Sequence, residues 1–424
     1  MVLKFEQEDI ISAQLKKYGL KFNPFPVKGE VSRNAPYIEM SGEVNQEIEK
    51  FVNLVTSKKT WHGLVLQGDN GTGKTRLLYL LEQQLNSQLK YANAIYAHDP
   101  QSDPIKFFSN IIFSCDFDKL ILLILNQGDN KKRIFEIIDK NLIITATISG
   151  TRTAKIQNIK KIVKEINNFF EPQLNISENL RLGYSVLILY HILKEEDKYK
   201  IISDNSTFSQ TDEINWFLSG EQFQSSKLDK FGIIPFTKVD KKVMSRQIFN
   251  AFLKFNHLAG KTTIFVLYDE FNYVIDNISK TRIIQVLDMI IATIEANPTG
   301  FCMVLSCLVD SWKYSKRLSP SFSERFGSAI SMPQLKHEKV LELTKAYLNY
   351  GRIKEDESID PFTEEAIDRV LTLSLYNQRE FLHTNSVLLG ELITEKSLDK
   401  IDVKLVNRIM KTIKTQKVLL DDFK

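Results

Sequence analysis

The fold is decided by the stretch Gly63-Leu-Val-Leu-Gln-Gly-Asp-Asn-Gly-Thr-Gly-Lys-Thr75. It begins with a short apolar run, continues into a turn that fits the pattern G-x-x-x-x-G-K-[ST], and leads into the helical pattern of Leu77–Leu89. Strand, glycine turn and helix in this order form the first unit of an α/β fold. Such a turn directs backbone N–H groups at one point, where the N-terminus of the next helix also favours an anion. The sequence therefore predicts a phosphate-binding loop at residues 68–75.

The residues of this loop are expected to bind the phosphates of a nucleotide. They are Gly68, Asp69, Asn70, Gly71, Thr72, Gly73, Lys74 and Thr75. Lys74 is expected to reach the β- and γ-phosphates and to take part in catalysis, and the Thr75 hydroxyl to ligate Mg²⁺. A glycine turn without a ligand is the alternative interpretation of the same pattern.

A second stretch, Ile264-Phe-Val-Leu-Tyr-Asp-Glu270, is an apolar run that ends in two acids. Asp269 is expected to hold the magnesium ion, directly or through water, and Glu270 to polarise the attacking water. An Asp-Glu pair alone is uninformative, because acids also commonly begin helices. Following an apolar strand, in a chain with a phosphate loop, the pair predicts a magnesium-dependent nucleoside triphosphatase.

Three further residues are candidates for the same catalytic site. Ser306 lies on the next apolar run, Phe301–Leu308, either near the γ-phosphate or as a small core residue. Arg325, in the segment S-E-R-F, is expected to point into a neighbouring subunit's site and stabilise the transition state. Arg379, at the start of a later helix, is expected to fold back onto the nucleotide in the same chain. For either arginine, a solvated or ion-paired surface group is the alternative.

Spacing predicts the domain organisation. Strands are expected at Ala92–Ala97 and Thr263–Tyr268, and a βαβ crossover needs only a dozen or more residues. Most of the segment between these strands is therefore expected to be a helical insertion. The expected parts are a lead-in (1–50), an α/β core (51–332) with its insertion at about 105–245, and a helical C-terminal part (333–424) with helix starts at Thr363 and Asp402.

Composition restricts the class of protein. Of 424 residues, 43% are hydrophobic and 25% are charged, which is typical of a globular chain and excludes a disordered or collagenous one. A net charge of +4 excludes binding of nucleic acid through bulk charge alone. The three cysteines form no CxxC pair, so neither a disulfide framework nor a zinc site is expected. The sequence has neither a secretory signal pattern nor an apolar run of membrane-spanning length, so a cytoplasmic protein without a membrane partner is expected.

Taken together, these motifs resemble those of AAA+ ATPases, a P-loop family with a three-layer parallel sheet and a helical lid. The chain is most similar to the branch of origin-recognition initiators, transposition ATPases and ExeA-type proteins. The resemblance to this branch rests on Asn23-Pro-Phe25, Pro361-Phe-Thr-Glu-Glu-Ala366 and Asn377-Gln-Arg379. It implies that ATP is the nucleotide, that the lead-in covers the adenine, and that subunits form rings or filaments. The lid motif of that branch is Gly-Asn-Pro-Arg, whereas this chain has Tyr376 at the glycine and Gln378 at the proline.

A finer resemblance links the chain to the ATP-binding proteins of BREX phage-exclusion systems. It rests on Trp216-Phe-Leu-Ser-Gly-Glu221, which follows a long helical segment and precedes the acid-ended strand. This resemblance implies a role in phage defence or the handling of foreign DNA, beside a helicase or another protein partner. Alternatively, the aromatic residues of this box only anchor the insertion to the core.

Two functions are therefore compared. The favoured one is an oligomeric ATPase that remodels or loads a partner on DNA; the alternative is a low-turnover, ATP-gated switch whose insertion reads a partner or ligand. A small-molecule kinase is disfavoured by the lid and the arginines. Direct contact with DNA stays open, because the basic clusters at 131–133 and 152–164 lack interleaved aromatic residues and are also compatible with solvated helix faces.

Overall fold

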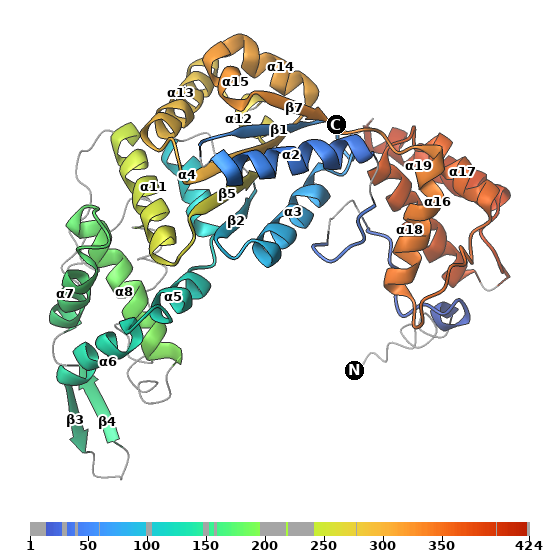
Figure 1. The fold of residues 1–424 in the computed structure, drawn as a ribbon. Helices are drawn as coiled ribbons and strands as arrows, with labels where there is room; N and C mark the ends of the chain where they lie inside the picture. The colour runs from blue at the N-terminus through green and yellow to red at the C-terminus, as the bar shows by residue number, and fades with distance from the viewer. Residues whose placement is uncertain are drawn as a thin grey trace. The chain divides into compact units, whose positions relative to one another are not determined.

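The structure is a computed structural model that describes residues 14–27, 32–38, 41–58, 60–98, 104–146, 152–156, 159–195, 218, 241–276, 278–395 and 397–421. The chain forms two compact units. Unit 1 consists of Met1–Lys50, Leu66–Leu81 and Ala329–Lys424, and unit 2 of Phe51–Val65 and Glu82–Ser328. Figure 1 shows the elements along the chain.

The strands are β1 (Gly63–Gln67), β2 (Ala92–Ala97), β3 (Leu142–Ala146), β4 (Arg152–Ile156), β5 (Thr263–Tyr268), β6 (Phe301–Cys307) and β7 (Ser328–Ser331). The helices are α2 (Gly42–Lys58), α3 (Lys74–Gln88), α4 (Pro104–Phe113), α5 (Phe117–Leu125), α6 (Asn130–Lys140), α7 (Ile159–Phe170), α8 (Glu178–Glu195), α11 (Lys241–Leu258), α12 (Asn272–Asp276), α13 (Lys280–Ala296), α14 (Val309–Leu318), α15 (Pro320–Phe326), α16 (His337–Gly351), α17 (Glu364–Leu373), α18 (Gln378–Thr394) and α19 (Val403–Asp421).

The main sheet has five strands in the order β2-β5-β6-β1-β7. β5 pairs in parallel with β2, from Ala92↔Thr263 to Ala97↔Tyr268, and also with β6. Every residue of β5 and β6 is buried, because parallel strands of an α/β sheet are covered on both faces. The predicted α/β fold with a parallel sheet is confirmed, and the predicted strands at 92–97 and 263–268 match β2 and β5.

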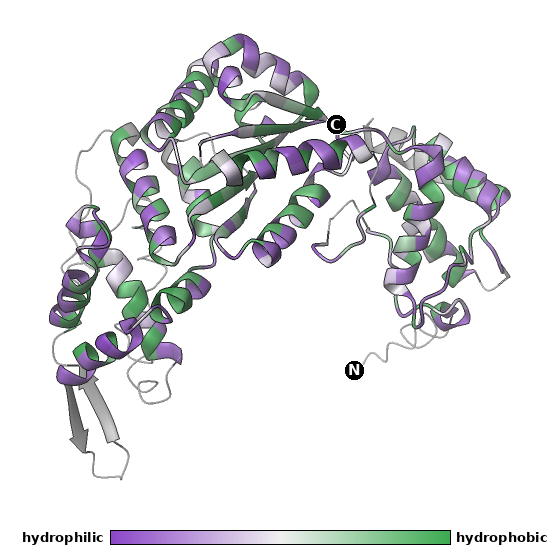
Figure 2. Ribbon diagram, viewed as in Figure 1, coloured by the Kyte–Doolittle hydropathy of each residue, from purple (hydrophilic) through white to green (hydrophobic). Residues whose placement is uncertain are grey.

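The core of unit 2 lies between the sheet and a group of helices. Helix α11 packs against α4 and α13, and α4 also contacts β2. Figure 2 shows hydrophobic residues on the strands and on the helix faces that meet them. Aromatic rings form much of this contact. The ring of Phe107 stacks on that of Tyr268 with 4.5 Å between the ring centroids, and the ring centroids of Phe108 and Phe249 lie 4.7 Å apart. This packing fixes the end of β5, where the two acids follow.

The segment predicted as a helical insertion contains helices and also two strands, which were not predicted. Helices α5 to α8 follow α4, and β3 pairs with β4 as an antiparallel hairpin from Leu142↔Ile156 to Ala146↔Arg152. Within β3, Ile143, Ile144 and Thr145 are β-branched residues, which favour a strand over a helix. The W-F-L-S-G-E box at 216–221 lies outside the described residues except for Leu218, which is buried.

Unit 1 contains the four C-terminal helices α16 to α19, which share one apolar core with the lead-in. The predicted helix starts are confirmed, because Thr363 caps α17 by accepting from the N–H of Ala366, and Asp402 accepts from the N–H of Leu405. In the lead-in, the Phe25 ring stacks on Tyr347 at 5.7 Å.

Strand β7 was not predicted from the sequence. It is only four residues long, Ser328–Ser331, and two of these residues are serines. Within unit 1, the N–H of Met332 directly after it donates to the carbonyl of Gln67 at the end of β1, at 2.8 Å. The strand thus lies beside the one that leads into the phosphate loop.

Candidate functional site

The phosphate loop lies between β1 and α3, and its backbone needs glycine. Gly71 has a φ of 81° and Gly73 a φ of 88°, in the left-handed region that favours glycine. A Cβ at Gly71 would lie 2.4 Å from Oδ1 of Asn377, closer than the side chain allows. The buried Thr72 hydroxyl donates to the carbonyl of Asp69 at 2.9 Å and closes the turn. The loop therefore combines left-handed backbone at two of its glycines with a turn that is closed by a hydrogen bond.

Lys74 begins helix α3 and lies over the loop. Its ammonium group donates to the carbonyl of Gly68 at 2.8 Å and to that of Asp69 at 2.9 Å. Both contacts hold the positive charge at the loop and beside the N-terminus of α3. Thr75, the next residue, is half-buried. The loop, the helix N-terminus and the ammonium group together favour an anion at this place.

The turn before α18 contacts the phosphate loop directly. The side-chain N–H of Asn377 donates to the carbonyl of Asn70 at 2.6 Å, and the backbone N–H of Arg379 donates to the carbonyl of Gly71 at 3.3 Å. The Arg379 side chain is exposed. Tyr376, at the glycine position of the resembled motif, has a φ of 59°, which lies in the left-handed region that favours glycine.

Sequence reasoning missed Arg76, which follows the loop motif directly. Its side chain is 8% exposed and donates to the carbonyls of Arg33, at 2.7 Å, and Pro36, at 3.4 Å. Burial lowers the pKa of this guanidinium from its ordinary value. The arginine connects the lead-in to α3. Its position directly after the loop motif was the only feature of the sequence that could have indicated this role.

In unit 2, Asp269 follows β5 and is 1% exposed. Its Oδ2 accepts a hydrogen bond from the Tyr96 hydroxyl at 2.9 Å, and its Oδ1 accepts one from the Ser306 hydroxyl. The N–H of Glu270 also donates to Oδ1, at 3.0 Å. The carboxylate is thus held by side chains on β2 and β6 and by the N–H of the residue that follows it. Ser306 contacts one of the predicted acids, while Tyr96 was missed because nothing local in the sequence links it to Asp269.

Glu270 occupies an unusual backbone conformation. Its φ is 57°, which is uncommon for a residue other than glycine, and residues in such sparsely populated conformations cluster at functional sites. The side chain is half-buried, and its Oε2 accepts from the side-chain amide of Asn272 at 3.4 Å. The two acids have different partners, because the Asp269 carboxylate is held by Tyr96 and Ser306 and the Glu270 carboxylate contacts Asn272.

Arg325 lies on α15, a short helix anchored by the buried rings of Phe322 and Phe326, which are 4.7 Å apart. Its guanidinium pairs with Glu295 on α13 at 2.7 Å, and the two side chains are 45% and 54% exposed. Ion pairs at this exposure contribute only about 0–1 kcal/mol to stability. The structure therefore places Arg325 on the surface of unit 2, in a contact that is easily exchanged.

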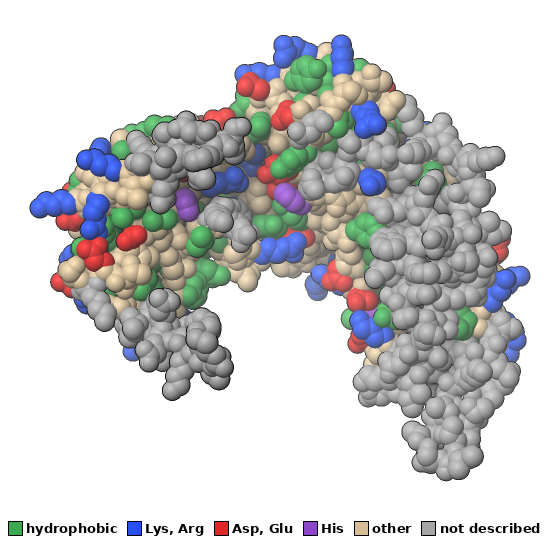
Figure 3. All heavy atoms as spheres, turned by 180° about the vertical axis from the view of Figure 1, so that it is seen from behind, with side chains coloured by type: hydrophobic (Ala, Val, Ile, Leu, Met, Phe, Trp, Pro, Cys, Tyr) green, Lys and Arg blue, Asp and Glu red, His purple; other side chains and the backbone are tan. Residues whose placement is uncertain are grey.

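The basic cluster at 131–133 lies partly against aromatic rings of the insertion. Lys131 lies over the Phe135 ring at 5.4 Å, and Arg133 over the Phe169 ring at 5.9 Å. On the face shown in Figure 3, lysines and arginines lie among acidic side chains. These contacts fit solvated helix faces as well as a contact with phosphates. The side chains of residues 152–156 lie outside the described part.

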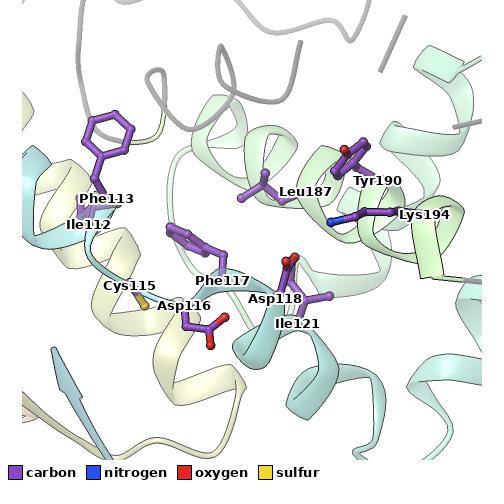
Figure 4. Close-up of a pocket in the computed structure, with 10 residues that line it drawn as sticks. All are labelled: Ile112, Phe113, Cys115, Asp116, Phe117, Asp118, Ile121, Leu187, Tyr190 and Lys194. Carbon is purple, nitrogen blue, oxygen red and sulfur yellow. The ribbon is translucent and has the colours of Figure 1, made fainter. Parts of the chain in front are cut away.

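A pocket of about 350 Å³ lies in the insertion, between the start of α5 and α8. Figure 4 shows the carboxylates of Asp116 and Asp118 on one side and the amine of Lys194 on the other. Both aspartates are exposed, and Asp118 pairs with His191 at 3.2 Å. The pocket contains none of the residues predicted for catalysis. Among the described helices, none has the length and apolarity needed to cross a membrane.

Comparison with known proteins gives partial likenesses. No family model matches the chain. Over 97 residues, 23% of this chain, it is 31% identical to an uncharacterized HTH-type transcriptional regulator of Methanocaldococcus jannaschii, and it spans only 24% of that protein.

Among solved structures, the chain is similar to the Aeropyrum pernix ORC1 protein in complex with DNA, with a TM-score of 0.44 and 9% sequence identity. The matched region covers 89% of this chain and 66% of the ORC1 chain. It is also similar to the ADP form of the Aeropyrum pernix ORC2 protein, with a TM-score of 0.44, 10% identity, and coverage of 91% and 73%.

Proposed function

We propose that the chain is a magnesium-dependent ATPase of the AAA+ type. The observation that carries this proposal is the loop between β1 and α3, which combines the G-x-x-x-x-G-K-T pattern with left-handed backbone at Gly71 and Gly73 and with Lys74 at the helix start. Loops of this kind bind triphosphates through backbone N–H groups and the helix N-terminus. Lys74 then exchanges its contacts with loop carbonyls for the β- and γ-phosphates.

The residues present suit a magnesium ion. Mg²⁺ prefers oxygen donors and takes only one or two from the protein, completing its shell with phosphate and water oxygens. In the described part of the chain, no three His, Cys, Asp or Glu side chains cluster as a protein-only metal site would require. We assign the Asp269 carboxylate and the Thr75 hydroxyl as its protein donors, directly or through water. When bound, the ion neutralises charge on the phosphate oxygens.

Hydrolysis is assigned to Glu270 as the residue that orients and polarises the attacking water. Its carboxylate is half-buried and accepts at Oε2 from Asn272, whereas the partners of Asp269 are Tyr96 and Ser306. Ser306, through its hydrogen bond to Oδ1 of Asp269, would hold in place the carboxylate that is assigned to the metal. This division leaves one acid for the metal and one for water.

Two arginines supply positive charge in the transition state. Arg325 and its partner Glu295 are both exposed, so the arginine can exchange this pair for a contact in the site of a neighbouring subunit. Such a contact is head-to-tail, and repetition of it generates a ring or a filament. Arg379 is assigned to the nucleotide of its own chain, because its backbone N–H already contacts the carbonyl of Gly71.

The biological role proposed is the remodelling or loading of a partner on DNA, in phage defence or the handling of foreign DNA. Its support is the resemblance of the lead-in, lid and W-F-L-S-G-E motifs to such ATPases. The partner is DNA itself, a helicase or another DNA-bound protein.

The test is the steady-state ATPase rate with no addition, with double-stranded DNA and with single-stranded DNA, each at two salt concentrations. Stimulation by DNA that weakens with salt supports direct contact with phosphates. Turnover near zero in every condition, together with tight ATP binding, contradicts the proposed ATPase and supports the ATP-gated switch.

A further inference from the structure

The side chain of Asn377 contacts two elements at once. Its Nδ2 donates to the carbonyl of Asn70 in the phosphate loop at 2.6 Å. Its Oδ1 accepts from the backbone N–H of Glu380 at 3.1 Å and so caps the N-terminus of α18. One carboxamide therefore connects the peptide that precedes Gly71 with the first turn of a lid helix.

The turn 377–379 also lies close to two glycines of the loop. A Cβ at Gly71 would lie 2.4 Å from Oδ1 of Asn377, and one at Gly73 would lie 2.9 Å from Oε1 of Gln378. The N–H of Arg379 adds a backbone hydrogen bond to the carbonyl of Gly71. The turn 377–379 thus packs directly on the two glycines whose N–H groups are expected to face phosphate.

We propose that Asn377 is a positioning residue that couples nucleotide binding at the phosphate loop to the start of helix α18. This inference rests on the proposed binding of a nucleotide at that loop. Phosphates that bind the N–H groups of the loop fix its peptides, and the Asn70 carbonyl, once fixed, is a better partner for Asn377. The capped first turn of α18 then becomes more stable, and a preformed cap favours nucleotide binding equally, because such coupling is reciprocal.

The chemistry of the side chain separates this role from simple capping. Asp and Ser cap helices about as well as Asn does. Only a carboxamide, however, offers an acceptor to the Glu380 N–H and a donor to the Asn70 carbonyl at the same time. Aspartate at this position keeps the cap but places a carboxylate oxygen against the carbonyl of Asn70. Asn377→Asp thus removes the link to the loop and leaves the cap.

The experiment compares the wild type with Asn377→Asp, Asn377→Ala and Thr363→Ala. Thr363 is the matched control, because it caps α17 through the N–H of Ala366 at 3.2 Å without contacting the loop. Three quantities are measured: the thermal midpoint without nucleotide, the affinity for ADP by calorimetry, and hydrogen exchange of the amides in the first turn of α18 with and without ADP.

The coupling predicts a specific pattern. Asn377→Asp unfolds near the wild-type temperature but binds ADP about 5- to 30-fold more weakly, within the usual range of coupling between sites. Asn377→Ala loses both stability and affinity, whereas Thr363→Ala loses stability alone. ADP slows exchange in the first turn of α18 of the wild type, and this protection is absent in Asn377→Asp. Asn377→Ser is measured as well, since serine caps the helix, is too short to reach the loop and adds no negative charge beside the phosphates. It should show the same weaker binding and the same loss of protection, whereas wild-type affinity in Asn377→Ser would assign the effect of Asn377→Asp to charge repulsion and contradict the coupling.

Two failures are distinguishable. If the wild type binds ADP and Asn377→Asp binds it equally well with the same protection of α18, the coupling is wrong and the proposed function stands. If the folded wild type binds neither ADP nor ATP, the proposed function is wrong, and the proposed coupling is then wrong as well.

Discussion

The hydroxyl of Tyr96, on β2, donates a hydrogen bond of 2.9 Å to Oδ2 of Asp269, which follows the neighbouring strand β5. The Ser306 hydroxyl, on β6, donates to the other carboxylate oxygen. Strands on both sides of β5 therefore fix a carboxylate that is almost fully buried. A buried acid needs such partners, and outer hydrogen bonds of this kind orient metal ligands in proteins.

Tyr96→Phe removes one of these partners and is expected to weaken magnesium use. The magnesium concentration for half-maximal turnover should rise by about 10-fold or more, as for other changes in groups that hold a metal ligand. Stability should fall by about 1–3 kcal/mol, because a buried acceptor loses its donor. The measurements are ATPase rates over a magnesium titration and denaturant unfolding.

The matched control is Tyr273→Phe, since the Tyr273 ring is 45% exposed and lies three residues after Glu270. This variant should titrate like the wild type. A wild-type magnesium dependence in Tyr96→Phe would show that Asp269 does not depend on Tyr96 for its role.

Glu270→Gln should separate nucleotide binding from hydrolysis. The amide keeps the shape of the side chain but cannot act as a base, so turnover should fall by about 10²–10⁴-fold. ATP affinity, measured by calorimetry, should stay close to that of the wild type. An exposed acid, Glu43, provides the control variant Glu43→Gln, which should change neither quantity. Retained turnover in Glu270→Gln would remove this residue from the proposed mechanism.

Arg325→Ala should abolish most turnover without much loss of stability. An arginine supplied from a neighbouring subunit contributes about 10³–10⁵ in rate, whereas its exposed pair with Glu295 contributes about 0–1 kcal/mol to folding. Glu295→Gln removes the same ion pair and should leave the rate unchanged.

Mixing two inactive variants tests whether Arg325 acts between subunits. In a mixture of Arg325→Ala and Lys74→Ala chains, some interfaces combine an intact loop with an intact arginine, so part of the activity should return. If the mixture is as inactive as its components while both variants still assemble, Arg325 acts within its own chain or only in folding.

Burial of Cys115 predicts a pH dependence of stability. Burial raises the pKa of this thiol to about 12, while an unfolded cysteine has a pKa of about 8.5. The folded chain therefore keeps a proton that the unfolded chain loses, so this contribution to stability is complete below pH 8.5 and declines as the pH rises toward 12.

Cys115→Ala should reduce the fall in unfolding free energy between pH 8 and pH 10. All three cysteines are buried, so a thiol reagent at pH 8 should label the chain only after unfolding. Rapid labelling of Cys115 in the folded wild type would contradict this account of the thiol.

The sequence was sufficient to predict those elements whose structure is determined by a local pattern. The glycine loop, the strands at 92–97 and 263–268, and the helix start at Thr363 were predicted because apolar runs, glycines and caps act over a few residues. The hairpin of β3 and β4 and the short strand β7 were missed, because their stability comes from pairing with other strands more than from their own composition.

The contacts of the candidate site were less accessible to prediction. Tyr96 and Asp269 are separated by 173 positions, and Asn377 and Asn70 by 307, so only the fold brings them together. Tyr376 illustrates a different difficulty, because its left-handed backbone at a position where glycine is usual is set by the surrounding turn. The roles of Arg325 and Arg379 remain predictions.

The most direct measurement is calorimetric titration of the purified chain with ATP in the presence of magnesium, for the wild type and for Lys74→Ala. The account predicts that the wild type takes up one ATP per chain with a dissociation constant on the order of 1 μM to 1 mM, and that Lys74→Ala, although folded, binds at least about 10-fold more weakly. A folded wild type that takes up no ATP, ADP or GTP would contradict it.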